Sequence, residues 1–152
     1  MPNLDLSAGV LREVQDVLGV RFADPALLKQ ALVHRSLINE ADLVDADCNE
    51  RLEFLGDAAL GLVTAQLLLE RYPDRAEGQL SLACASLVNL NTLGRFAQQI
   101  DMGKYLQLGR GEDRSGGRAR GTVAGRGFEA VLGAIYLDRG LATLSFDGPG
   151  QG

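Results

Sequence analysis

The segment Asn49-Glu50-Arg51-Leu52-Glu53-Phe54-Leu55-Gly56-Asp57 carries three carboxylates at spacings of three and four residues. On a helix, this spacing stacks Glu50, Glu53 and Asp57 on one face. Like charges so placed repel one another, and a hard divalent cation such as Mg²⁺ removes the repulsion because it prefers carboxylate oxygen. The spacing alone leaves two interpretations open: a metal site, or a solvated acidic face paired with neighbouring basic side chains.

Apolar residues recur at helical spacing on both sides of this segment. Asp24-Pro25 is a helix start signal, and Pro73 is a stop signal. The predicted helices run from a cap at Asp5 or Ser7 to about 18, and over about 24–32, 49–72, 77–88, 91–100 and 122–137. Polar residues, glycines and arginines predict loops over 37–48 and 103–121. No segment shows sustained period-two alternation, so the sequence predicts an all-α fold.

Glycines interrupt two of the predicted helices. Gly56 and Gly61 lower the helix propensity of 49–72, so we expect close packing against another backbone there. Gly125 and Gly127 weaken the last helix by roughly 1 kcal/mol each relative to alanine.

The length of 152 residues and a hydrophobic fraction of 46% fit one domain, which we place at residues 1–141. Residues 142–152 are rich in glycine, and we expect a disordered tail. Cys48 and Cys84 show neither metal-ligand nor disulfide spacing. The chain shows no signal-peptide pattern and no stretch approaching the roughly 20 apolar residues of a membrane span. We therefore expect a cytoplasmic protein without membrane contact.

Charge is distributed unevenly along the chain. The net charge of −5 argues mildly against nucleic-acid binding. Five arginines nevertheless fall within seventeen residues, namely Arg110, Arg114, Arg118, Arg120 and Arg126. They form a local basic segment in an acidic protein.

The opening segment, continued by Ala58-Ala59-Leu60-Gly61-Leu62, resembles the signature of the ribonuclease III family nearly residue for residue. Further segments agree with the family in order and spacing, namely 34–36, 39–40, 77–80, 85–89, 108–112, 115–117 and 128–138. The resemblance covers about residues 10–141. It implies a ribonuclease III-type helical endonuclease domain.

The resemblance also implies an activity and a set of site residues. Members of this family are homodimeric endonucleases that hydrolyse double-stranded RNA with Mg²⁺, with Mn²⁺ as a substitute, in ribosomal and other RNA processing. Glu53, Asp57 and Glu129 match the metal-site acids, and Asp57 and Glu129 are the expected catalytic residues. Glu50 matches an accessory acid, and Glu77 matches a position near the substrate.

Two further residues have alternative roles. Phe54 matches the family's aromatic knob at the dimer interface, and its position between Glu53 and Asp57 favours this role over an ordinary core phenylalanine. His34 is either a ligand or a hydrogen-bonded structural histidine, and the structural role is favoured.

The sequence departs from the family at Arg126, which stands where the family carries a metal-site aspartate three residues before Glu129. Arginine cannot lose its charge near pH 7. It either forms a salt bridge with Glu129 or Glu53 in the metal's place, or turns to solvent and contacts RNA phosphate. Either outcome predicts impaired cleavage.

A second departure is length, since we expect the chain to contain no separate double-stranded-RNA-binding domain. The competing hypotheses are an active endonuclease and a catalytically silent module that binds duplex RNA or acts as a dimeric scaffold. An unrelated helical bundle would require the ordered motifs to be a coincidence.

Overall fold

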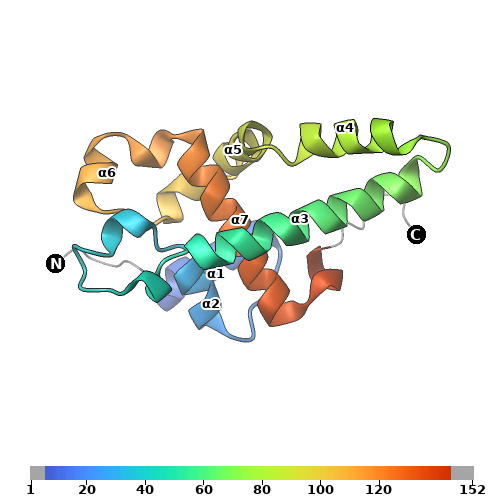
Figure 1. Ribbon diagram of the computed structural model, residues 1–152. Coiled ribbons are helices and arrows are strands. Elements are labelled where there is room, and N and C mark those ends of the chain that lie inside the picture. Colours follow the sequence, from blue (N-terminus) through green and yellow to red (C-terminus); the bar gives the residue numbers. More distant parts are fainter. Residues whose placement is uncertain (1–5, 145–152) are drawn as a thin grey trace.

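Two long helices, α3 (Glu50–Arg71) and α7 (Gly121–Arg139), cross at the centre of the molecule (Figure 1). The computed structural model describes residues 6–144, and the crossing organises the helices within that range. The start of α3 is fixed by Asn49, which is buried and donates from its Nδ2 to the Ala31 carbonyl at 3.2 Å. α7 packs most extensively against α3 and α5 (Leu90–Gln99).

Glycines bring α3 and α7 into backbone contact. A Cβ built on Gly56 would lie 1.7 Å from the carbonyl oxygen of Glu129, and one on Gly133 would lie 2.1 Å from that of Leu52. The close packing expected at Gly56 is confirmed. The same expectation was wrong for Gly61, where an added Cβ would meet nothing within 4 Å.

The two glycines that flank Arg126 also have packing roles. A Cβ on Gly125 would lie 3.0 Å from the backbone nitrogen of Gly94 on α5, and one on Gly127 would lie 2.7 Å from Leu106 Cδ2. Because glycine has no Cβ, α7 can approach its neighbours closely at these two positions, and the lower helix propensity of glycine is the accompanying cost.

The predicted helices are confirmed to within about two residues at their ends, and capping side chains explain several of the starts. Ser7 accepts a hydrogen bond from the Val10 amide at 3.3 Å, and Asp24 accepts one from Ala26 at 3.1 Å. The remaining helices are α1 (Ala8–Leu18), α2 (Pro25–Ala31), α4 (Glu77–Leu87) and α6 (Arg110–Arg114). The fold is all-α, and within residues 6–144 the only strand-like pairing is an isolated bridge between Val33 and Gln107.

The two segments predicted as loops contain short helices, and to that extent the prediction was wrong. The 3-10 turns are η1 (Arg35–Leu37), η2 (Asp45–Asp47), η3 (Met102–Tyr105) and η4 (Gly117–Ala119), and α6 lies among them. Buried apolar side chains such as Leu37 and Leu106, together with tertiary hydrogen bonds, order these segments, although their apolar residues do not recur at helical spacing. The Glu40 carboxylate accepts from the Arg110 amide at 2.8 Å, and the Arg118 guanidinium donates to the Leu106 carbonyl at 2.6 Å. Residues 142–144 of the predicted tail belong to the turn η5 (Leu141–Leu144), and residues 145–152 lie outside the described residues.

Helix α4 lies beside the C-terminal half of α3, and the two form an arm that extends away from the other helices (Figure 1). No residue of α4 is buried. By length and composition alone, α3 is apolar enough to cross a membrane, so the expectation that no stretch approaches this composition was wrong. Only a minority of that apolar segment is buried, which leaves an apolar face of the arm exposed.

Candidate active site

Carboxylates from α3 and α7 converge where the two helices cross. We call Glu53, Asp57 and Glu129 the acidic cluster. Glu129 is 6% exposed, and its carboxyl lies close enough to Asp57 and Glu53 for them to raise its pKa. The backbone contact at Gly56 positions this group, because it places the Glu129 peptide directly against α3.

Arg126 lies one turn before Glu129 on α7 and is paired with the acidic cluster. Its Nη1 donates to Glu53 Oε1 at 3.1 Å. The Arg126 side chain is 58% exposed, whereas that of Glu53 is 21% exposed. Of the two orientations left open by the sequence, the structure contains the salt bridge, with Glu53 as its partner.

Burial makes Glu129 and Glu53 hard to ionise. Burial, the hydrogen bond to Asp57 and the charges of Asp57 and Glu53 together raise the pKa of Glu129 to about 8, against a smaller opposing effect of Arg126. Burial also raises the pKa of Glu53, and the Arg126 charge opposes that shift. With a pKa of about 8, Glu129 stays largely protonated near neutral pH.

The acidic cluster supplies the ligand type that a hard divalent cation prefers, because its three members are carboxylates from two neighbouring helices. A cation would displace the retained proton and relieve the repulsion among the acids. Arg126 occupies an oxygen of Glu53, however. Within residues 6–144, no three His, Cys, Asp or Glu side chains lie close enough together to hold a metal ion, so the acids would have to move together to bind one.

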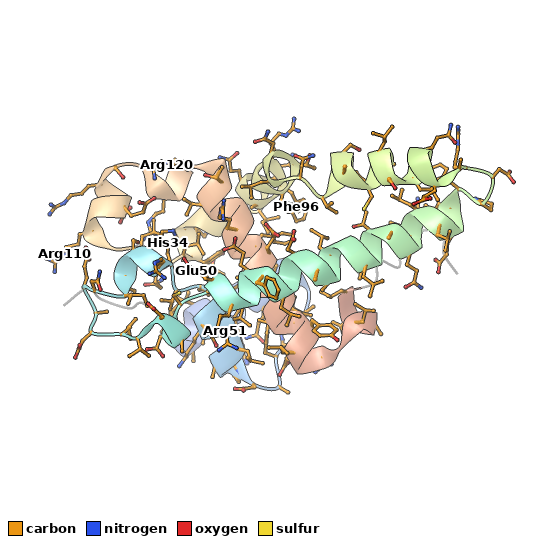
Figure 2. All side chains as sticks on the ribbon, in the orientation of Figure 1. His34, Glu50, Arg51, Phe96, Arg110 and Arg120 are labelled. Atoms are coloured by element: carbon orange, nitrogen blue, oxygen red, sulfur yellow. The ribbon has the colours of Figure 1, made fainter. Side chains whose placement is uncertain are left out.

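The other predicted site residues lie at different distances from this cluster. Glu50 is one turn before Glu53, on the first turn of α3, where its carboxylate accepts from Arg35 Nη1 at 3.2 Å (Figure 2). Glu77 begins α4 at the far end of the arm, beyond the C-terminus of α3. The helical rise from Asp57 to the end of α3 is about 21 Å, so a single chain does not bring Glu77 to the cluster.

Phe54 is 81% exposed, so it is not a core residue of the isolated chain. It borders a hollow whose lining includes Leu27, Leu55 and Leu137. An aromatic side chain exposed to this extent beside an apolar hollow is typical of an association surface.

His34 has the contacts of a structural residue. Its Nδ1 accepts from the Ser36 amide at 3.0 Å and lies 2.7 Å from Ser36 Oγ. Ser36 Oγ in turn accepts from the Gly109 amide at 2.8 Å. Burial lowers the pKa of His34, against the opposing charges of Glu112 and Glu50. These contacts join the segment around His34 to the start of α6.

Three of the five arginines in the basic segment (110–126) form contacts within the protein. The amino-acid composition of the segment did not reveal these contacts. Arg118 binds backbone carbonyls and Asp113, Arg120 binds Glu112 and Ser115, and Arg126 binds Glu53. In the described part of the chain, Arg110 and Arg114 have no salt-bridge partner, and Arg110 lies at the outer edge of α6 (Figure 2). The free positive charge is therefore smaller than the arginine count suggests.

Comparison with known proteins gives one consistent family. A sequence profile of Ribonuclease-III-like proteins matches residues 24–145. The chain is 47% identical over 131 residues to Ribonuclease 3 of Syntrophobacter fumaroxidans, covering 86% of this chain and 54% of that protein. It is 45% identical over 140 residues to Ribonuclease 3 of Thermobifida fusca, covering 92% and 57%. The chain thus spans about half the length of the curated relatives it matches.

A solved structure matches over nearly its whole length. The nuclease domain of ribonuclease III from Campylobacter jejuni superimposes with a TM-score of 0.80 at 33% identity, covering 88% of this chain and 89% of that one. Dicer from Pichia stipitis matches more distantly, with a TM-score of 0.56 at 26% identity, over 80% of this chain and 48% of that one. The chain belongs to the ribonuclease III family and has the fold of its nuclease domain.

Proposed function

We propose that this domain hydrolyses double-stranded RNA at the acidic cluster with the help of Mg²⁺, and that Arg126 lowers the rate. The observation that carries the proposal is the convergence of Glu53, Asp57 and Glu129 from two helices in a nuclease-domain fold. The substrates would be structured RNAs such as ribosomal precursors, and the compartment would be the cytoplasm.

Glu53, Asp57 and Glu129 would hold the cation, and Mn²⁺ could replace Mg²⁺ because both are suited to carboxylate oxygen. When bound, the cation supplies an activated water and neutralises charge on the phosphate. Asp57 and Glu129 are the proposed catalytic residues. Glu129 must lose the proton that it holds near neutral pH before it can bind the cation. Arg126 hinders this arrangement because its guanidinium occupies a Glu53 oxygen. Glu50 would add negative charge one turn away.

The proposal includes a homodimer with Phe54 at its interface. Phe54, Leu62 and Leu69 are exposed and spaced eight and seven residues apart, so they form one stripe along α3. In a two-fold dimer the same patch serves both subunits, and Phe54 beside an apolar hollow is suited to such self-complementary packing. The similar nuclease domain from Campylobacter jejuni shows structural flexibility in a region involved in its dimer formation. Glu77 lies far from the acidic cluster of its own chain, and we propose that it lies near the bound RNA.

The ion pair between Arg126 and Glu53 favours a second candidate function. If the pair persists in solution with Mg²⁺ present, the domain would bind duplex RNA or act as a dimeric scaffold without cutting. This module would keep the fold and the interface of the family but not its chemistry.

A gel assay of long duplex RNA in Mg²⁺ separates the two candidates. The wild-type chain is run beside Arg126→Asp, which recreates the family's acidic position, and beside Glu129→Ala, which removes the buried acid. Slow cleavage by the wild type, lost in Glu129→Ala, supports the endonuclease. Duplex binding without cleavage in the wild type and in Arg126→Asp supports the silent module.

A further inference from the structure

The Arg126 guanidinium uses only part of its hydrogen-bonding capacity within the protein. Arginine carries five N–H donors on a planar group. One nitrogen, Nη1, donates to Glu53 Oε1, and no other partner of the side chain is found among residues 6–144. Since 58% of the side chain is exposed, the remaining donors are accessible at the surface of the acidic cluster.

The neighbours of Arg126 restrict what those donors can bind. Glu53 holds one side of the guanidinium, and the charged groups of Asp57 and Glu129 lie near Glu53 at the helix crossing. Glu50 adds a further carboxylate one turn away on α3. A ligand must therefore be an anion that gains enough from a paired, directional contact to approach acidic groups. Phosphodiester oxygens meet this requirement, because the guanidinium presents two parallel donors that match their geometry.

A bound metal ion in a nuclease site links protein carboxylates to a phosphate oxygen by its positive charge. The Arg126 guanidinium has a fixed positive charge, one contact to a carboxylate and free donors on the solvent side. We propose that Arg126 links Glu53 to a backbone phosphate of duplex RNA, so that this site binds the duplex without a divalent metal. The inference rests on the proposed function for its substrate and adds a metal-independent mode of binding.

The test measures duplex RNA binding by fluorescence anisotropy, in EDTA and in Mg²⁺, apart from any cleavage. The wild-type chain is expected to bind with similar affinity in both conditions. Arg126→Gln removes the charge while keeping a polar side chain, and should weaken binding in EDTA by roughly tenfold, the loss expected for one charge-assisted contact. Because a phosphate contact releases counterions, this variant should also lower the salt dependence of log K by about one contact.

Arg12→Gln is the matched control, since Arg12 is an exposed arginine on α1 and the substitution removes the same charge away from the helix crossing. It should change affinity much less than Arg126→Gln. Arg126→Lys should recover only part of the affinity, because an ammonium group lacks the planar pair of donors.

The inference is overturned if the wild type binds duplex only when Mg²⁺ is present, or if Arg126→Gln and Arg12→Gln weaken binding equally. If binding needs Mg²⁺ while Arg126→Asp cleaves the duplex, the inference fails and the proposed function stands. Absence of duplex binding and cleavage for every variant in both conditions contradicts both.

Discussion

Replacing Gly56 by alanine should destabilise the domain through the helix crossing that supports the acidic cluster. The added Cβ would lie 1.7 Å from the Glu129 carbonyl oxygen, 2.7 Å from its carbonyl carbon and 2.9 Å from the Gly133 nitrogen. Real Cβ contacts are essentially never below 3.0 Å, so the helices must separate by at least 1.3 Å, the difference between 3.0 and 1.7 Å. The obstructing atoms are backbone, and no side-chain rotation relieves the overlap.

Overpacking of this kind costs about 1–3 kcal/mol or more, and the rigid backbone places Gly56→Ala at the upper end. Alanine returns about 1 kcal/mol of helix propensity. The net loss in free energy of unfolding is therefore about 2 kcal/mol, or roughly 4–8 °C in Tm for a domain of this size. Urea denaturation followed by circular dichroism measures it. Cleavage should fall as well, because the shift displaces Glu129 from Asp57.

Gly61→Ala provides the control on the same helix. A Cβ there meets nothing within 4 Å, so this variant should gain up to about 1 kcal/mol. The reasoning is refuted if Gly56→Ala is as stable as the wild type, or if both substitutions shift stability by the same amount.

Two further predictions concern titration and association. Because the folded-state pKa of Glu129 is about 8, above its ordinary value of 4.5, its contribution to stability is complete below about pH 4.5 and is lost as the pH rises to about 8. Thermal unfolding should show the wild type losing stability over this range by at most about 1.4 kcal/mol per pH unit relative to Glu129→Gln; a constant difference between the two proteins would contradict the shift. Phe54→Ala should raise the dimer dissociation constant by roughly 30-fold in sedimentation experiments, as for a central interface aromatic. It should change the stability of the monomer by less than about 0.5 kcal/mol, because Phe54 is 81% exposed. An unchanged dimer would exclude Phe54 from the interface.

Local signals were sufficient for most of the fold. Helical periodicity, caps such as Asp24 and the stop at Pro73 predicted the long helices, because these signals act over a few residues. The short helices between residues 103 and 121 were missed. Their order comes from long-range contacts, such as the burial of Leu106 in the core and the hydrogen bond from the Arg110 amide to Glu40, which joins positions seventy residues apart. Gly56 and Gly61 lie five residues apart on α3, which is about 140° around the helix, and the path of α7 determines which of them meets another backbone.

The candidate site could be predicted by residue type but not by pairing. Spacing placed Glu50, Glu53 and Asp57 on one helix face, and the family resemblance added Glu129. The burial of Glu129 and its closeness to Asp57 depend on the angle and distance between two helices, which no local pattern encodes. The choice of Glu53 as the partner of Arg126 depends on the same geometry.

The central claim is that the acidic cluster is an endonuclease site that Arg126 impairs. Its most direct test is the single-turnover rate of duplex RNA cleavage in Mg²⁺ by Arg126→Asp relative to the wild type. The account predicts that the variant cuts faster by roughly tenfold or more, since it frees the Glu53 oxygen and adds a carboxylate. A wild-type chain that cuts at a rate Arg126→Asp does not improve would contradict it.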